Sequence, residues 1–479
     1  MAAVRRPGDD EGWRVRARQV RRRGRARAGR AGVVALASAV LLGAAAVPGP
    51  QALAGGFTGA AGSLPAASAG SGGYAFAEDA RSVDGAASPG DSVELEPGRT
   101  YRSTLPARGK VYYRLTLDDS TNTYASATAA PPAGRTASVV DGIKVAVEDG
   151  EGRSCDVDTE SFGAAGSRHP LAGWAMREIS PRRSLCQEAA TYYLTVERVD
   201  PDGDGSSPGP WEMELAATAE PPLEKAGATS APTAWDSAPP RPVEGEPQRR
   251  TGGAGFSRAV PVGQGVWRDD IRPGQTLFYE VPVDWGRRLH ATAELGGSGA
   301  GGSGYVAAAL DLDLYNPVRG HVVDATVGYD GTRKTGSLAA LPPVAHVNRH
   351  AVSRQVAAMR FAGSYYLVAH LSSEVADAFG DGPVPLTLRV GLSGAAQDGP
   401  GYAGESVPAD AFTVTGEDRE TAAGGGAAGD DTAYRALAVG GIGAGTALLA
   451  GLGVWTLAAR RRTAAQTAAG SRQEPFRSA

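Results

Sequence analysis

One stretch of this chain repeats another. Residues 101–129 align without a gap with residues 267–295, at an offset of 166. Similarity of this kind indicates one structural unit used twice, so it constrains the fold of both halves. Two further pairs of segments match less tightly, namely 143–149 with 310–316 and 192–194 with 365–367.

Both copies show the pattern of β-strands. Residues 110–117 place Val, Tyr and Leu at every second position, and residues 310–314 alternate leucine with Asp311 and Asp313. A period of two is typical of a strand with one buried and one wet face. Turn pairs such as Pro97-Gly98 and Pro273-Gly274 separate these runs. The predicted fold class is therefore all-β, with two tandem antiparallel β-sandwich domains and one C-terminal transmembrane helix.

The helix is predicted from residues 436–459, which carry no charge over 24 positions. A helix needs about 20 apolar residues to cross a bilayer core. Arg460, Arg461 and Arg462 follow at once, and cationic flanks stay cytoplasmic, so the residues before the span face outward. Gly441 and Gly445 have the spacing of a helix-pairing motif, which could form a dimer or reflect the frequency of glycine in such helices.

The N-terminus predicts export. Eleven arginines lie within residues 1–30, an uncharged run follows at 31–47, and Ala52-Leu53-Ala54 precedes Gly55. These features are typical of a signal peptide cleaved between Ala54 and Gly55. An uncleaved N-terminal anchor, or translation from a start codon further downstream, remains an alternative.

Composition divides the rest of the chain. The predicted parts are a signal peptide (1–54), a flexible linker (55–90), sandwich 1 (91–218), a Pro-rich linker (219–255), sandwich 2 (256–395), a flexible acidic stalk (396–433), the transmembrane helix (434–459) and a cytoplasmic tail (460–479).

Charge and cysteine content limit the classes of partner and the cellular compartment that fit this sequence. Residues 55–459 contain 32 basic and 48 acidic residues, a net charge of −16, which disfavours nucleic acid as a partner. Cys155 and Cys186 are the two cysteines, and an oxidising location favours a disulfide between them over free thiols or a metal site.

Two groups of aspartates could bind calcium. Asp200, Asp202 and Asp204 begin like an oxygen-ligand loop, but position 12 is Trp211 where such loops carry a bidentate carboxylate. A solvated hairpin turn explains these three residues as well. Asp311 and Asp313 share one strand face and could supply calcium oxygens, or form the wet side of a sheet. No other cofactor is predicted.

No catalytic motif is found. His346 and His350 have i, i+4 spacing but lack the glutamate of a zinc-protease helix, and Pro342-Pro343 argues against a helix there. The sequence contains no G-x-S-x-G. Trp174, Trp267 and Trp285 could stack on sugars or pack in the core. We therefore expect that the protein is not an enzyme.

Three segments resemble the bacterial pre-peptidase C-terminal domain, a β-sandwich of exported proteins. They are Arg272–Val281 (RPGQTLFYEV), Leu312–Pro317 (LDLYNP) and Ala362–Val368 (AGSYYLV). The first copy lacks a clear counterpart of Asn316-Pro317. The resemblance implies a non-catalytic accessory or binding module, sometimes calcium-dependent. With four lysines among 48 basic residues, the whole chain is also similar to exported single-span actinobacterial proteins.

These observations predict a single-pass protein of the cell membrane with its N-terminal part outside. The first functional hypothesis is a binding or scaffolding protein that displays two sandwiches to an envelope protein or glycan. The alternative is an accessory subunit of a membrane or secretion complex, coupled through its span and Arg-rich tail.

Overall fold

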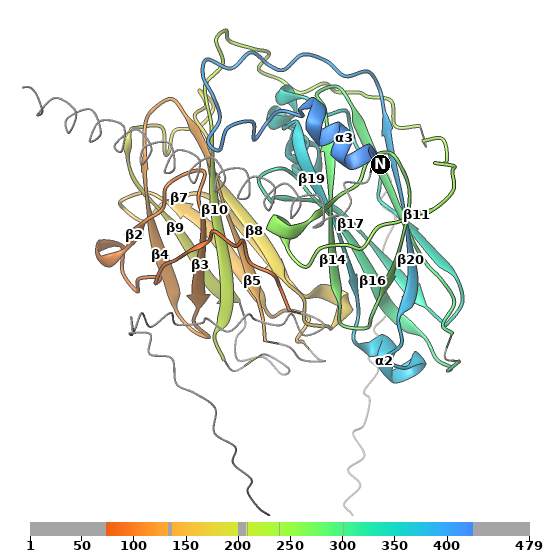
Figure 1. Cartoon of the computed structure of the whole chain (residues 1–479). Helices are drawn as coiled ribbons and strands as arrows, with labels where there is room; N and C mark the ends of the chain where they lie inside the picture. The colour runs from red at the N-terminus through yellow and green to blue at the C-terminus, as the bar shows by residue number, and fades with distance from the viewer. Residues whose placement is uncertain are drawn as a thin grey trace, which may run out of the picture. The chain divides into compact units, whose positions relative to one another are not determined.

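The computed structural model describes residues 73–132, 137–199, 207, 209–238, 240–299 and 301–424. Within them the chain forms two β-sandwiches of two five-stranded sheets each (Figure 1). Eight main strands of each sandwich are divided between its two sheets in the order of a jelly roll, and the fourth and fifth of them pair as a hairpin within one sheet. Two short strands at the start of each copy extend the two sheets in parallel, and every other ladder is antiparallel.

Sandwich 1 contains the strand predicted at residues 110–117, which is β4. Its first sheet has the order β1 (Arg81–Ser82), β3 (Thr100–Leu105), β10 (Trp211–Glu220), β5 (Asn122–Ala130) and β8 (Leu171–Arg177). Its second sheet has the order β2 (Val93–Glu94), β4 (Lys110–Leu117), β9 (Ala190–Val199), β6 (Gly142–Glu148) and β7 (Ser154–Ser161).

Sandwich 2 repeats this topology. Its first sheet has the order β11 (Gln248–Arg249), β13 (Gly265–Ile271), β20 (Val384–Ser393), β15 (Arg288–Leu295) and β18 (Lys334–Ser337). Its second sheet has the order β12 (Val260–Pro261), β14 (Thr276–Val283), β19 (Gly363–Leu371), β16 (Val306–Tyr315) and β17 (His321–Tyr329).

Short helices connect the strands. The single-turn 3₁₀ helices are η1 (Pro89–Asp91), η2 (Gly163–Ala165), η3 (Phe256–Arg258) and η4 (His346–His350), and the α-helices are α1 (Arg354–Ala358), α2 (Glu374–Phe379) and α3 (Gly416–Gly424).

Equivalent side chains confirm the internal repeat. Tyr113 donates to Ser103 at 2.7 Å, and Tyr279, 166 residues later, donates to Asp269 at 2.8 Å. The structure also shows that Asp149, which the match of 143–149 with 310–316 places opposite Asn316, has the same role. Asn316 accepts from backbone N–H groups in the turn after β16, and Asp149 does the same in the turn after β6. The Asn316-Pro317 segment therefore stabilises a turn.

The segment after β20 contacts both copies. Sequence predicts a mobile stalk at 396–433, whereas its described part, residues 396–424, packs on the sandwiches. Val407 forms a bridge with Ala219 of β10, and Phe412 is 2% exposed. The backbone N–H of Gly263 donates to Ala422 in α3 at 2.9 Å. The Gly-rich composition of this segment predicts flexibility, but burial of its aromatic side chains holds it against the sandwiches.

The predicted signal peptide and its cleavage site between Ala54 and Gly55 lie outside the described residues. So do the span, Gly441 and Gly445, and the three arginines at 460–462. Among the residues that are described, no helix has the length and apolar character needed to cross a membrane.

Candidate functional site

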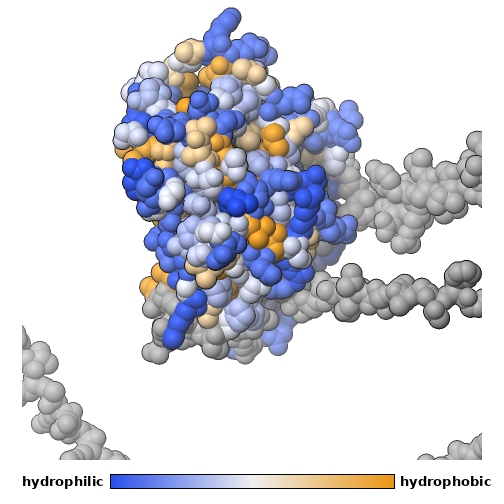
Figure 2. Space-filling view, turned by 90° about the vertical axis from the view of Figure 1, so that its left-hand side faces the viewer, coloured by the Kyte–Doolittle hydropathy of each residue, from blue (hydrophilic) through white to orange (hydrophobic). Residues whose placement is uncertain are grey.

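Part of one sheet of sandwich 1 is buried on both faces. Strands β5 and β8 are buried along nearly their whole length, which differs from the alternation in β4. Ala125 and Ala127 of β5 enter the core of sandwich 1, while Tyr124 packs with Phe361 from sandwich 2. The molecular face on the left of Figure 1 is mostly hydrophilic, with small separate hydrophobic patches (Figure 2). The outward side of the β5–β8 sheet is therefore an internal junction.

Besides a longer contact between Glu178 and Arg349 at 3.9 Å, three buried ion pairs cross this junction with the same polarity. Sandwich 1 supplies each carboxylate and sandwich 2 each guanidinium. The pairs are Glu214–Arg319 at 2.7 Å, Glu220–Arg349 at 2.6 Å and Glu178–Arg360 at 3.1 Å. Each of the six side chains is at most 11% exposed. Removing one member of such a pair leaves an uncompensated buried charge, so the pairs specify one arrangement of the sandwiches.

Glu220 accepts hydrogen bonds from several parts of the chain besides Arg349. It accepts from Asn122 at 2.8 Å and Tyr124 at 2.7 Å, both on β5, and from Tyr402 at 2.8 Å in the segment after β20. Burial alone would raise its pKa, but the charge of Arg349 and these hydrogen bonds outweigh burial and lower the pKa to about 2. Glu220 is therefore ionised, and it joins three parts of the chain.

Aromatic side chains fill the space beside the ion pairs. Tyr124 meets Phe361 edge-on at 4.8 Å, and Phe361 stacks on Phe412 at 4.9 Å. The indole of Trp174 lies against Gly320, where an added Cβ would come within 2.5 Å of the ring. Trp174 therefore packs in the junction, which selects the packing alternative for this residue. Trp267 is 3% exposed and also packs internally.

A serine and a histidine also meet across the junction. His370 Nε2 lies 3.0 Å from Ser167 Oγ, and its Nδ1 lies 2.9 Å from Thr276 Oγ1. Ser167 and His370 are 0% and 1% exposed. Burial and the neighbouring His169 lower the pKa of His370 well below its ordinary value, so the ring is neutral at pH 7. A substrate has no access to this pair, and its geometry serves packing.

A groove of about 390 Å³ opens along the junction. Sandwich 1 contributes Glu178 and Arg182, and sandwich 2 contributes His346, Arg349 and His350 from η4. Burial first, and then the charge of Arg349, lowers the pKa of His346 to about 4. His346 lies 3.6 Å from Glu220. Both histidines of the HVNRH segment line the groove.

A second pocket, of about 430 Å³, lies under the segment after β20. We call it the Trp285 pocket. Its walls come from the β14–β15 turn, from residues 397–402 and from residues 412–419. Trp285 contributes to both pocket and core, because it also packs against two hydrophobic clusters.

The calcium candidates divide between masked and described positions. Asp200, Asp202 and Asp204 lie outside the described residues. Asp313 pairs with His321 at 3.3 Å, and burial raises the pKa of Asp311 to about 6. In the portion of the chain that the structure describes, no three His, Cys, Asp or Glu side chains are placed to hold a metal ion.

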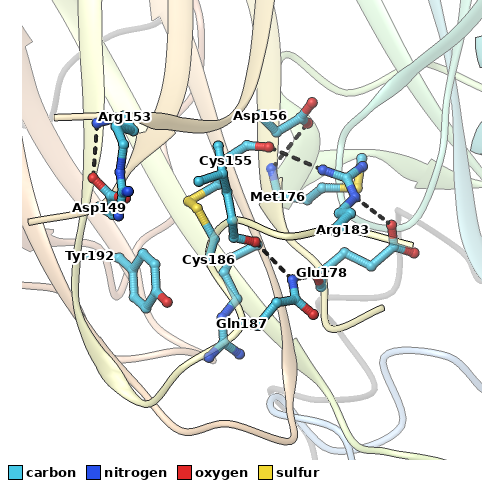
Figure 3. Close-up of a disulfide and its surroundings, with 12 residues drawn as sticks. Asp149, Arg153, Cys155, Asp156, Met176, Glu178, Arg183, Cys186, Gln187 and Tyr192 are labelled. Carbon is cyan, nitrogen blue, oxygen red and sulfur yellow. Dashed lines mark hydrogen bonds and ion pairs between the residues drawn. A yellow bond between two sulfur atoms is a disulfide. The ribbon is translucent and has the colours of Figure 1, made fainter. Parts of the chain in front are cut away.

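The disulfide prediction is confirmed. Cys155 of β7 bonds Cys186 in the loop after β8 (Figure 3). The same loop carries Arg183, which donates to the carbonyl of Cys155 at 3.0 Å and lies 3.4 Å from Glu178. The disulfide therefore anchors the loop that adjoins a junction carboxylate.

Sequence reasoning missed the junction glutamates and arginines. Glu214 and Glu220 lie on the same face of β10, and that face would be exposed to solvent in a single sandwich. A signal was present in residues 122–130 and 171–177, where small and aromatic side chains occupy both strand faces. Strands without polar alternation are typical of sheets covered on both sides.

Comparisons give no family assignment. No protein-family model matches the chain, and no curated protein matches it. Among solved structures, the CBM22 tandem of Paenibacillus barcinonensis Xyn10C is 9% identical, covers 60% of this chain and 83% of its own, and has a TM-score of 0.16. Tandem CBM51 modules of Streptococcus pneumoniae Sp3GH98 are 7% identical over 61% and 83%, with a TM-score of 0.17. The human MASP-1/3 CUB1-EGF-CUB2 region is 9% identical over 61% and 99%, with a TM-score of 0.14. Scores this low carry no information about the ligand of this chain.

Proposed function

We propose that this chain is a non-catalytic binding protein of the cell surface. Residues 434–459 anchor it in the membrane, and both sandwiches face outward as one rigid body that binds a glycan or protein of the envelope. The observation that carries the proposal is the junction with its buried Glu–Arg pairs.

A fixed junction favours binding. The groove and the Trp285 pocket are formed by segments that the junction already holds in place, so little ordering remains to oppose association. The clustered Ser167 and His370 are closed to substrate, which supports a non-catalytic role. The pre-peptidase C-terminal resemblance and the topology predicted from the sequence agree with this assignment.

Protease treatment of intact cells tests the location. An epitope tag after Ala479 should survive on a short membrane-bound fragment, while the sandwiches are removed. Protection of the sandwiches in intact cells would refute the surface assignment.

Site-specific crosslinking tests binding. A photo-crosslinker at Thr229, on the groove, should capture an envelope component that the same probe at Thr335, on the outer strand β18, does not capture. Equal capture at both positions, or none at Thr229, would argue against a binding groove. Deleting residues 460–479 should leave capture intact, whereas its loss would favour the alternative of an accessory subunit coupled through the tail.

A further inference from the structure

The Trp285 pocket combines an aromatic floor with a polar rim. We propose that it binds a neutral saccharide unit of an envelope glycan. The inference rests on the proposed function, because an outward-facing body would meet such glycans, but the pocket itself supplies the chemistry.

The floor is apolar and partly aromatic. Trp285, Phe412 and Val414 line it, and the last two are 2% and 8% exposed. Trp285 is partly buried by the core, which orients the indole before a ligand arrives. The C–H face of a sugar ring packs favourably on such a ring, because the aromatic face is electron-rich and sheds water readily.

The rim carries side chains that suit hydroxyl groups. Gln397, Asp398, Thr413 and Arg419 line the pocket, and all four are exposed. An amide, a carboxylate, a hydroxyl and a guanidinium together offer both donors and acceptors, as a ring of sugar hydroxyls requires. A small set of polar groups around an apolar floor is typical of small-ligand pockets of this volume.

Charge at the rim favours a neutral ligand. Arg419 pairs with Asp284 at 2.5 Å, which neutralises the cation of the pocket. Asp398 remains as a carboxylate on the same rim. The lining thus holds two carboxylates, Asp284 and Asp398, against one guanidinium, so an anionic sugar or a phosphate would meet an excess of negative charge at the pocket wall, whereas a neutral saccharide would not be repelled.

Backbone contacts hold the pocket open. The N–H of Gln397 donates to the carbonyl of Trp285 at 2.8 Å, and Arg419 donates to the carbonyl of Val414 at 3.0 Å. Gly399 lies at the indole edge, where an added Cβ would sit 3.1 Å from Nε1. A side chain at position 399 would therefore press on the edge of the ring and narrow the pocket, while the groups that make the two hydrogen bonds above are retained.

Titration of the purified full chain with soluble oligosaccharides tests the proposal. The probes are cellotetraose, maltotetraose, xylotetraose and chitotetraose, with inorganic phosphate and a heparin tetrasaccharide as anionic probes. Calorimetry should show saturable binding of at least one neutral probe and no binding of either anionic one. Trp285→Ala and Gly399→Val should each weaken that binding about tenfold or more. Thr335→Ala, on the outer strand β18 and outside both pockets, serves as the control and should leave it unchanged.

The outcomes separate this inference from the proposed function. Absence of binding by all four neutral probes overturns the saccharide assignment, and so does binding that Trp285→Ala and Gly399→Val leave unaltered. Tighter binding of the anionic probes would overturn the charge argument. None of these results changes the protease and crosslinking tests in cells. Because Gly399→Val adds a side chain and removes none, it keeps the test decisive if Trp285→Ala fails to fold.

Discussion

Replacing Glu220 by alanine should weaken the junction between the two sandwiches and lower the free energy of unfolding. The substitution removes the acceptor of Arg349, Tyr124, Tyr402 and Asn122 at one step. It leaves the guanidinium of Arg349, which is only 9% exposed, without its closest carboxylate. We therefore expect a loss of stability well above that of an ordinary surface mutation.

Two estimates give the expected loss of stability. Breaking a buried ion pair by removing one partner typically costs about 3–5 kcal/mol. The pKa of Glu220 falls from the ordinary 4.5 to about 2 on folding, and a shift of this size corresponds to about 3 kcal/mol. Both values are a large fraction of the stability of a typical domain.

Glu212 provides a matched control. It lies on the same strand, and it pairs with Arg102 on the surface, with both side chains about half exposed. Glu212→Ala should change the free energy of unfolding by less than about 1 kcal/mol. Urea unfolding of the full chain, followed by tryptophan fluorescence, measures both variants. A Glu220→Ala cost no larger than that of Glu212→Ala would refute the reasoning.

Three further predictions concern the disulfide, the histidines and calcium. Replacing Cys155 and Cys186 together by serine should lower stability by about 3–4 kcal/mol, because the 31-residue separation closes a sizeable loop, and dithiothreitol should then have no further effect on unfolding. Burial lowers the pKa values of His169 and His370, so the folded state binds fewer protons than the unfolded state below pH 6.5, and the free energy of unfolding falls as pH drops below that value. His370→Gln should therefore reduce the slope of the free energy of unfolding against pH between 6.5 and 5. An unchanged slope would contradict this. EDTA should leave the melting temperature unchanged, because Asp313 already pairs with His321, and a fall of several degrees would show a structural cation.

The sequence predicted local structure better than the arrangement of its parts. Alternation in residues 110–117 and 310–314 located β4 and β16, and the repeat at 166 residues anticipated two copies of one topology. Compartment and composition were enough to predict the disulfide. These features depend on neighbours along one strand or on chemistry that a single chain segment reveals.

The junction depends on contacts between distant segments. Glu220 and Arg349 are 129 residues apart, and neither carries a local motif. A carboxylate at an outward strand position predicts solvent exposure unless a second domain covers that face. The Trp285 pocket was hidden for the same reason, because Arg419 and Phe412 belong to a segment whose composition indicates a flexible stalk.

The central claim is that the two sandwiches form one rigid body. Nitroxide labels at Thr104→Cys on β3 and Thr335→Cys on β18 would report the distance between them by pulsed electron resonance. One narrow distance distribution is expected in the full chain, and a broader one after Glu220→Ala. A broad distribution in the otherwise unmodified protein would show that the Glu–Arg pairs do not fix the junction, and it would contradict the account.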